Sequence, residues 1–215
     1  MQTLLLRLAA PLQSWGSSSK FEIRTTEKMP TKSGVVGMLA AALGLGRDSN
    51  LSELNVLQFG VRADREGENI IDFHMVHSEK SSYVTYRHYL SDAVFLVGLS
   101  GKAEVLKELE IALQNPRFPL FLGRRSCPPT LPIVVGIRNL PLETALCKES
   151  PLTEKHDNLM RIQIETDHPN AEMMQDVPIS FNPNVRRVFG YRKCREFFVE
   201  FNQNETEHDA MLELG

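Results

Sequence analysis

Two short stretches of the chain combine glycine, hydroxyl and cationic residues in the way that phosphate-binding sites do. The first is Pro30-Thr31-Lys32-Ser33-Gly34, which opens an apolar run that predicts a buried helix over residues 33–43. A helix N-terminus presents unpaired backbone N–H groups, and such groups bind anions. Gly34 has no side chain, so a ligand or another backbone can approach the first turn closely. A core helix whose glycines only permit close packing explains the same residues, and both interpretations stay open.

The second stretch is Gly123-Arg124-Arg125-Ser126, which is followed by Cys127-Pro128-Pro129. Guanidinium groups donate paired N–H bonds to phosphate oxygens and base edges. Two arginines between a glycine bend and a hydroxyl therefore favour contact with a nucleic acid. A solvent-exposed basic turn is the alternative.

The only tryptophan, Trp15, lies in a long predicted loop between residues 11 and 29 that also carries Arg24 and Lys28. An indole ring can stack on bases while neighbouring cations bind phosphates. Alternatively, Trp15 fills the edge of the hydrophobic core and the cations are solvated. The residues alone do not separate these two interpretations.

The sequence carries no familiar catalytic signature, such as a P-loop, HExxH, GxSxG or Rossmann glycine motif. His74 and His77 lie three apart in a predicted strand, which sends them to opposite faces and argues against a shared metal ion. General acid–base chemistry by His74, His77 or His88 is an alternative. We expect no catalytic residue, no metal and no cofactor.

The net charge of −3 gives no general attraction to nucleic acid or membranes, but the charge is unevenly distributed. Residues 1–47 hold six Lys/Arg against two acids, residues 186–195 hold five Lys/Arg and no acid, and residues 196–215 hold six acids and no Lys/Arg. This distribution suits a subunit that contacts a polyanion on one side and protein elsewhere. The three cysteines form no CxxC pair, which favours reduced thiols and a cytoplasmic location. No apolar run is long enough to cross a membrane.

The hydrophobic pattern predicts an α+β fold. The predicted order of strand, helix, strand, strand, helix, strand over residues 1–138 is that of an RRM-like, ferredoxin-like domain. Strands are predicted at residues 3–10, 56–64, 70–77, 93–99 and 131–137, and helices at residues 33–43 and 102–113. The strands at 56–64 and 70–77 are expected to pair as a hairpin across a turn at 65–69, and residues 78–89 to project as a polar and aromatic arm.

A boundary is predicted near residue 138. Residues 139–215 are expected to form a smaller β-rich region with an acidic tail. Its predicted strands are 160–165, 186–190 and 195–201, and residues 166–183 are read as irregular and proline-rich.

Four motifs, in this order along the chain, closely resemble the CasD family of Cascade subunits from type I-E CRISPR systems, which belongs to the RAMP proteins. They are Leu6-Arg7-Leu8-Ala9-Ala10-Pro11-Leu12-Gln13-Ser14-Trp15-Gly16, Pro30-Thr31-Lys32-Ser33-Gly34 with its apolar helix, Arg87-His88-Tyr89-Leu90-Ser91-Asp92-Ala93, and Leu122-Gly123-Arg124-Arg125-Ser126-Cys127-Pro128. The resemblance spans residues 6–128 and is looser in the final third.

The resemblance implies an RRM-like domain with a protruding thumb hairpin, which maps to about residues 78–89 and looks short for the family. Members cap the 5′ end of the complex, hold the 5′ handle of the crRNA, contact the backbone and large subunits, and meet target DNA indirectly. The implied RNA-binding residues are Trp15, Arg24, Lys32, Ser33, Gly34, Gly123, Arg124, Arg125 and Ser126.

The subtype that the chain resembles uses a separate nuclease, so the expected function is non-catalytic RNA binding in antiviral defence. The alternative is a metal-independent endoribonuclease that processes precursor crRNA, since relatives in another CRISPR subtype cut RNA with a Tyr/Lys/His-type site. A purely structural interaction module is a third alternative.

Overall fold

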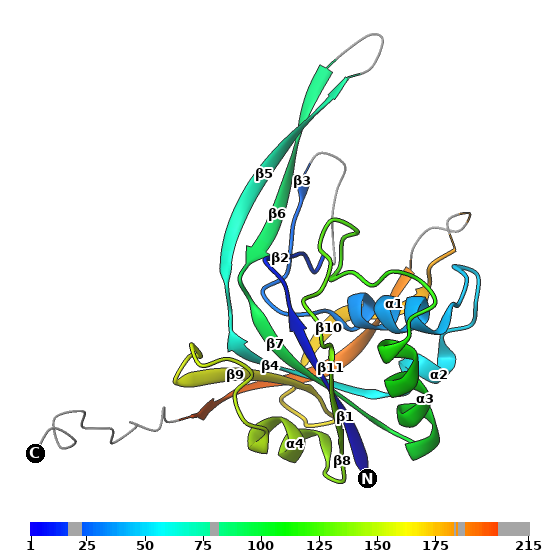
Figure 1. Cartoon of the computed structure of the whole chain (residues 1–215), viewed down its shortest axis with the longest axis vertical. Helices are drawn as coiled ribbons and strands as arrows, with labels where there is room; N and C mark the ends of the chain where they lie inside the picture. The colour runs from blue at the N-terminus through cyan, green and yellow to red at the C-terminus, as the bar shows by residue number, and fades with distance from the viewer. Residues whose placement is uncertain (17–22, 78–81, 183, 185–187, 202–215) are drawn as a thin grey trace, which may run out of the picture.

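The computed structural model describes residues 1–16, 23–77, 82–182, 184 and 188–201. Two β-sheets and four helices make up this part of the chain, and one long hairpin extends away from the rest (Figure 1). The predicted α+β class is confirmed. None of the described helices is long and apolar enough to span a membrane.

The larger sheet has seven antiparallel strands in the order β10-β11-β9-β4-β7-β1-β8. The strands are β1 (Gln2–Ala9), β4 (Gln58–Arg65), β7 (Val94–Gly101), β8 (Val134–Arg138), β9 (Leu159–Glu165), β10 (Glu172–Ser180) and β11 (Val188–Glu200). β1, β4 and β7 lie in the interior of the sheet and are almost entirely buried. Their near-continuous apolar sequences reflect helical cover on both faces.

Helices cover both faces of this sheet. Leu4, Leu6 and Leu8 of β1 pack into the core that contains α1 (Lys32–Leu43) and α3 (Ala103–Gln114), and the short α2 (Ser52–Asn55) adds Leu54 to it. Leu5, which points to the opposite face, packs with α4 (Leu142–Lys148). The same strand therefore contributes to two separate cores.

α1 has the capped, buried form that its sequence predicts. Thr31 is the N-cap, and its Oγ1 accepts a hydrogen bond of 3.2 Å from the Gly34 backbone N–H. Gly44 ends the helix in the left-handed conformation at φ 77°. Eight of the twelve residues between these caps are buried.

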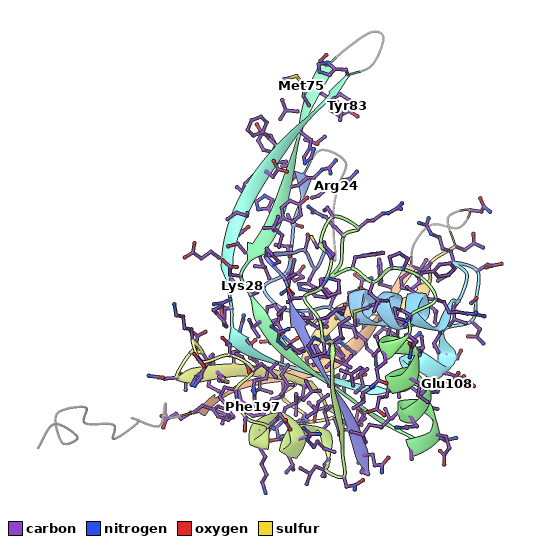
Figure 2. All side chains as sticks on the ribbon, viewed as in Figure 1. Arg24, Lys28, Met75, Tyr83, Glu108 and Phe197 are labelled. Carbon is purple, nitrogen blue, oxygen red and sulfur yellow. The ribbon has the colours of Figure 1, made fainter. Side chains whose placement is uncertain are left out.

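The smaller sheet carries the projecting hairpin, made of β5 (Glu68–His77) and β6 (Ser82–Ser91). Their register is unbroken from the pair Glu68–Ser91 to the pair His77–Ser82. The short strands β2 (Leu12–Gln13) and β3 (Ile23–Arg24) pair with the other edge of β6. Figure 2 shows Met75 and Tyr83 near the far end of the hairpin, which we call the arm, and Arg24 beside its lower half.

Two predictions about the arm are wrong. The segments at 56–64 and 70–77 do not pair with each other, because β4 pairs with β7 and β9 while β5 pairs with β6. β4 is buried on both faces and needs a strand on each side, whereas β5 is largely exposed and leaves the large sheet. The arm consequently spans residues 68–91, of which 78–81 lie outside the described residues, so it is longer than the predicted 78–89.

The C-terminal strands differ from prediction in two ways. β10 was predicted as irregular proline-rich chain; it is an edge strand, the position at which a proline such as Pro178 is tolerated. The two predicted strands at 186–190 and 195–201 are one strand, β11; residues 186 and 187 lie outside the described residues. Because β9 pairs with β4, strands from both sides of residue 138 share one sheet. The division into 1–138 and 139–215 stays a prediction.

Candidate nucleic-acid interface

The loop Gly123–Ser126 lies directly on the backbone of the Trp15 segment. Gly123 has φ 82°, and a Cβ atom there would lie 1.7 Å from the Ser14 carbonyl oxygen. The Ser14 N–H donates to the Leu122 carbonyl at 3.2 Å. Only glycine fits at position 123, because both the left-handed backbone and the close approach exclude a side chain. Two of the sequence motifs are thus joined backbone to backbone.

Arg124 connects this loop to the base of the arm. Its Nη2 donates to the Arg24 carbonyl oxygen at 2.8 Å, and its guanidinium carbon lies 4.8 Å from the centroid of the Tyr89 ring. The contact over the ring is a cation–π interaction. The structure therefore brings together Arg24 and Arg124, two predicted RNA-binding residues that are 100 positions apart.

Tyr89 on β6 is buried beneath these cations, with a relative exposure of 4%. Burial alone would raise the pKa of its phenol. Hydrogen bonds from Ser126, Arg124 and Arg87, together with the Arg124 charge, outweigh burial and hold the Tyr89 pKa below its ordinary value of 10.0. The phenol oxygen is therefore surrounded by donors.

These arginines have no acidic counterpart in the described part of the chain. No ion pair there joins Arg24, Arg87, Arg124 or Arg125 to a carboxylate. Arg87 Nε and Arg124 Nη1 are buried and have no hydrogen-bond partner among the described atoms. Asp72 lies opposite Arg87 in the β5–β6 ladder, but its carboxylate is hydrogen bonded to His74 Nε2 at 2.6 Å.

We call Arg24, Arg87, Tyr89, Arg124, Arg125 and Ser126 the cationic cluster. Arg24, Arg125 and Ser126 are exposed, while Arg87 and Arg124 are half-buried. Four positive charges without an ion-pair partner favour a polyanionic ligand.

Sequence reasoning missed Arg87 and Tyr89 as members of this site, although both stand in the motif at 87–93. Their spacing of two would have placed them on one face of a strand. What that spacing does not reveal is that the face meets the loop at 123–126.

Trp15 does not offer a surface for base stacking. Its side chain is fully buried, and its Nε1 donates to Gln13 Oε1 at 3.1 Å. The six-membered ring of the indole lies against Gly34, where a Cβ atom would be 2.8 Å from its nearest atom. Of the two interpretations of Trp15, the structure favours the core residue, and Gly34 admits this ring rather than a ligand.

The first turn of α1 is occupied by internal partners. The Lys32 Nζ donates to the carbonyl oxygens of Asn55 and Leu57, both at 2.9 Å, and to Glu165 Oε2 at 2.8 Å. The Lys32 backbone N–H donates to Asp176 Oδ2 at 2.8 Å, so a carboxylate already lies where a phosphate was expected. Ser33 is 8% exposed, and its Oγ contacts Thr31 Oγ1 at 3.3 Å. These contacts favour the interpretation in which Lys32, Ser33 and Gly34 serve packing and internal hydrogen bonding, and their contact with RNA stays a prediction.

The histidines of the arm form no shared site. His74 contacts Asp72, and His77 Nδ1 lies 2.8 Å from Ser82 Oγ on the opposite face of the hairpin. No group of three or more His, Cys, Asp or Glu residues that could hold a metal ion occurs within the described ranges.

One face of the arm is apolar and open to solvent. Phe73 of β5, Tyr86 of β6 and Ile23 of β3 lie side by side in the ladder and are each about half exposed or more. Ile71 and Met75 extend the same face, with exposures of 60% and 58%. A continuous apolar patch on a projecting element is typical of an interaction surface.

Comparisons with known proteins converge on one family. The model of the CRISPR-associated protein (Cas_Cas5) family matches residues 3–195. The CRISPR system Cascade subunit CasD of Escherichia coli (strain K12) is 38% identical over 156 residues, which cover 62% of this chain and 70% of that protein.

Two solved structures share the fold. A chain of a CRISPR RNA-guided surveillance complex superposes with a TM-score of 0.81 at 32% identity and covers 92% of this chain and 90% of its own. A crystal structure of a Cas protein gives a TM-score of 0.73 at 41% identity, with coverage of 92% and 95%. The resemblance inferred from the four sequence motifs is confirmed, and the chain belongs to the CRISPR-associated Cas5 family.

Proposed function

We propose that the chain is the CasD-type subunit of a CRISPR Cascade surveillance complex in antiviral defence, and that it binds the 5′ handle of the crRNA without cutting it. The observation that carries the proposal is the cationic cluster, in which Arg87 and Arg124 lie against Tyr89, Arg24 and Arg125 are exposed in the adjoining segments, and none of the four arginines is paired with a carboxylate among the described residues. Membership of the Cas5 family and the similarity to a chain of an RNA-guided complex support RNA as the polyanion.

The fold provides a candidate frame for this role. β1, α1, β4, β7, α3 and β8 correspond to the RRM-like half, with sheet order β4-β7-β1-β8. The arm corresponds to the thumb. Its exposed Phe73 and Tyr86 offer an apolar surface to the backbone subunit, and through it the arm meets target DNA indirectly. A further surface contacts the large subunit.

The predicted RNA-binding residues divide into two groups under this proposal. Arg24, Arg124, Arg125 and Ser126 contact RNA: the guanidinium groups bind phosphates, and splayed bases stack on guanidinium planes. Trp15, Lys32, Ser33, Gly34 and Gly123 hold the loop and α1 in place beneath that surface. The free cysteines Cys127, Cys147 and Cys194 agree with action in the cytoplasm.

Co-purification tests the proposal. A tagged chain, expressed with the other subunits of its complex and with repeat RNA, is expected to retain crRNA. Arg124→Ala combined with Arg125→Ala is expected to lower crRNA retention about tenfold or more, because each charged contact contributes roughly 1.5–3 kcal/mol. The matched control is Arg47→Ala with Arg117→Ala, two exposed arginines outside the cluster. Equal crRNA retention by the two double variants, both with unchanged melting temperature, would contradict the site.

A further inference from the structure

Two guanidinium groups in the cationic cluster are held rigidly and still have unused donors. Arg124 is fixed by the Tyr89 ring on one side and by the Arg24 carbonyl through Nη2, which leaves Nη1 buried and unpartnered. Arg87 shares a strand face with Tyr89, lies near enough to its phenol to help lower the Tyr89 pKa, and has a buried Nε without a partner. The two side chains come from different segments, β6 and the loop at 123–126.

Resting on the proposed function, we propose that Arg87, Arg124 and Ser126 form a subsite for a single backbone phosphate of the RNA, and that Tyr89 is a positioning residue for the two arginines.

The energetics of burial require an anion at this place. A buried N–H without an acceptor costs roughly 1–3 kcal/mol, and two neighbouring guanidinium charges repel each other as well. Elsewhere the chain pairs such arginines with its own carboxylates: Arg62 with Asp64, Arg138 with Glu149 and Arg192 with Asp176. Among the described residues Arg87 and Arg124 have no such partner, so a ligand anion can supply the acceptor that the fold does not.

The donor set identifies this anion as a phosphate rather than a base. Both guanidinium groups only donate, and the planar N–H fork of arginine matches the oxygens of a phosphate. The O6 and N7 acceptors of guanine suit one arginine fork, whereas a phosphate offers oxygens to two guanidinium groups and a hydroxyl at the same time. The Ser126 hydroxyl can supply another donor. A subsite of this kind fixes the register of the strand and carries no sequence information of its own.

Exposed arginines near the subsite can bind the adjoining part of the RNA strand. Arg24 pairs with Arg87 in the ladder and Arg125 follows Arg124 in the loop; both are exposed, so neighbouring phosphates can continue onto them. Tyr89 holds Arg124 in place in the absence of RNA, because the guanidinium group already lies over its ring. The subsite is therefore preorganised.

Single-linkage neutralisation tests the subsite. The crRNA handle recovered by co-purification is synthesised as a series, each member carrying one uncharged methylphosphonate linkage at a successive position, and affinity for the full chain is measured by fluorescence anisotropy. We expect one linkage to lower affinity by about 10- to 100-fold, as loss of a charged hydrogen-bonded contact does, and the others to have smaller effects.

Variants assign that linkage to residues. Arg87→Gln is expected to bind the unmodified RNA more weakly than the wild-type chain does. Its affinity is expected not to fall further when the linkage that is critical for the wild-type chain is neutralised. Tyr89→Phe keeps the ring and removes the phenol oxygen. In this variant, neutralisation of the critical linkage is expected to lower affinity less than in the wild-type chain, while the melting temperature stays close to that of the wild type. Arg125→Gln, the exposed neighbour, is expected to weaken all members of the series alike.

The outcomes separate this inference from the proposed function. If the unmodified handle does not bind at all, the proposed function fails. If the handle binds but neutralisation of every linkage lowers affinity equally, RNA binding stands and the phosphate subsite is overturned. The same conclusion follows if Arg87→Gln and the charge-conserving Arg87→Lys both lose as much affinity as the wild-type chain when the same linkage is neutralised.

Discussion

The Oδ2 atom of Asp176 accepts a hydrogen bond of 2.8 Å from the backbone N–H of Lys32, which lies 144 residues earlier in the chain. The same carboxylate accepts from Arg192 Nε at 2.6 Å and from Arg192 Nη2 at 2.9 Å. An internal anion thus occupies the positive end of the α1 dipole, and a buried cation balances it. The N-terminus of α1 is an anion site whose ligand is part of the protein.

Asp176→Ala is expected to destabilise the fold by about 3–5 kcal/mol, because it leaves Arg192 buried without a counter-charge. Urea denaturation followed by circular dichroism measures the loss. Asp167→Ala, at an exposed aspartate of the neighbouring turn, is the control and is expected to stay within about 0.5 kcal/mol of wild type. A double change, Asp176→Leu with Arg192→Met, is expected to recover much of the stability. An equal loss in the Asp167 and Asp176 variants would contradict this account.

Gly34→Ala and Gly37→Ala, one helical turn apart in α1, are expected to change stability in opposite directions. A Cβ at Gly34 would lie 2.8 and 2.9 Å from two atoms of the Trp15 ring, whereas one at Gly37 would meet Phe181 at ordinary distances of 3.6 and 3.8 Å. We expect Gly37→Ala to gain up to about 1 kcal/mol from helix propensity, and Gly34→Ala to lose about 1–3 kcal/mol from overpacking. Thermal unfolding of both variants, with Trp15 fluorescence as a local probe, measures the difference. A stabilised Gly34→Ala variant would show that the ring can move aside.

Gly123→Ala is expected to weaken RNA binding by about tenfold or more, since the loop that carries Arg124 and Arg125 cannot keep its place against the Ser14 carbonyl. Gly190→Ala, where a Cβ would find only contacts of 3.7 Å or longer, is the matched control. Filter binding at fixed salt measures affinity, and the melting temperature separates local from global effects. Wild-type affinity in a folded Gly123→Ala protein would exclude the loop from the interface.

The Cys194 thiol makes stability fall at alkaline pH. Burial is the main cause that raises its pKa from 9.0 to about 11, with Asp176 and Glu165 adding to the shift and Arg192 opposing it. Between these two pH values the unfolded chain loses the thiol proton while the folded chain keeps it. The contribution of the Cys194 thiol to the free energy of unfolding is thus fully present below pH 9 and is lost as pH rises through about 11.

The comparison of wild type with Cys194→Ala isolates this effect. The difference in unfolding free energy between the two proteins is expected to shrink by about 2–3 kcal/mol from pH 8.5 to pH 11.5. Urea titrations at a series of pH values measure it. A difference that stays constant with pH would show that the thiol ionises as easily in the folded protein.

The endoribonuclease alternative makes a contrary prediction. We expect labelled repeat RNA to remain intact when incubated with the chain in EDTA, because His74 is hydrogen bonded to Asp72 and His77 to Ser82 on opposite faces of the arm. Denaturing gels with a time course measure cleavage. Specific cleavage that is lost in His74→Ala, His77→Ala or His88→Ala would favour the enzyme.

Local signals predicted much of the framework. The apolar runs of β1 and β7 and the uncharged run of α1, with which the sequence predicted two strands and a buried helix, are each confined to a few neighbouring residues. Such features are readable from the sequence because their physical causes are local.

The errors arose where the cause is distant. The sequence of β5 is typical of a strand that is exposed on at least one face. This pattern does not indicate whether the partner strand comes before or after β5 in the chain. The internal contacts of two predicted RNA-binding residues, Lys32 with Glu165 and Trp15 with Gly34, also come from other segments of the chain. The pairing of the loop at 123–126 with Tyr89 likewise depends on the tertiary fold.

The pairing of β9 with β4 has a consequence for synthesis. The ribosome delivers α1 and β4 early, but the carboxylates that neutralise Lys32 and cover the start of α1, Glu165 and Asp176, emerge more than a hundred residues later. Until those residues emerge, Lys32 has no counter-charge and the edge of β4 that pairs with β9 is unpaired. Folding is thus expected to complete only when the last strands leave the exit tunnel, and a prematurely terminated chain to be recognised by proteases before it can compete for a place in an assembly.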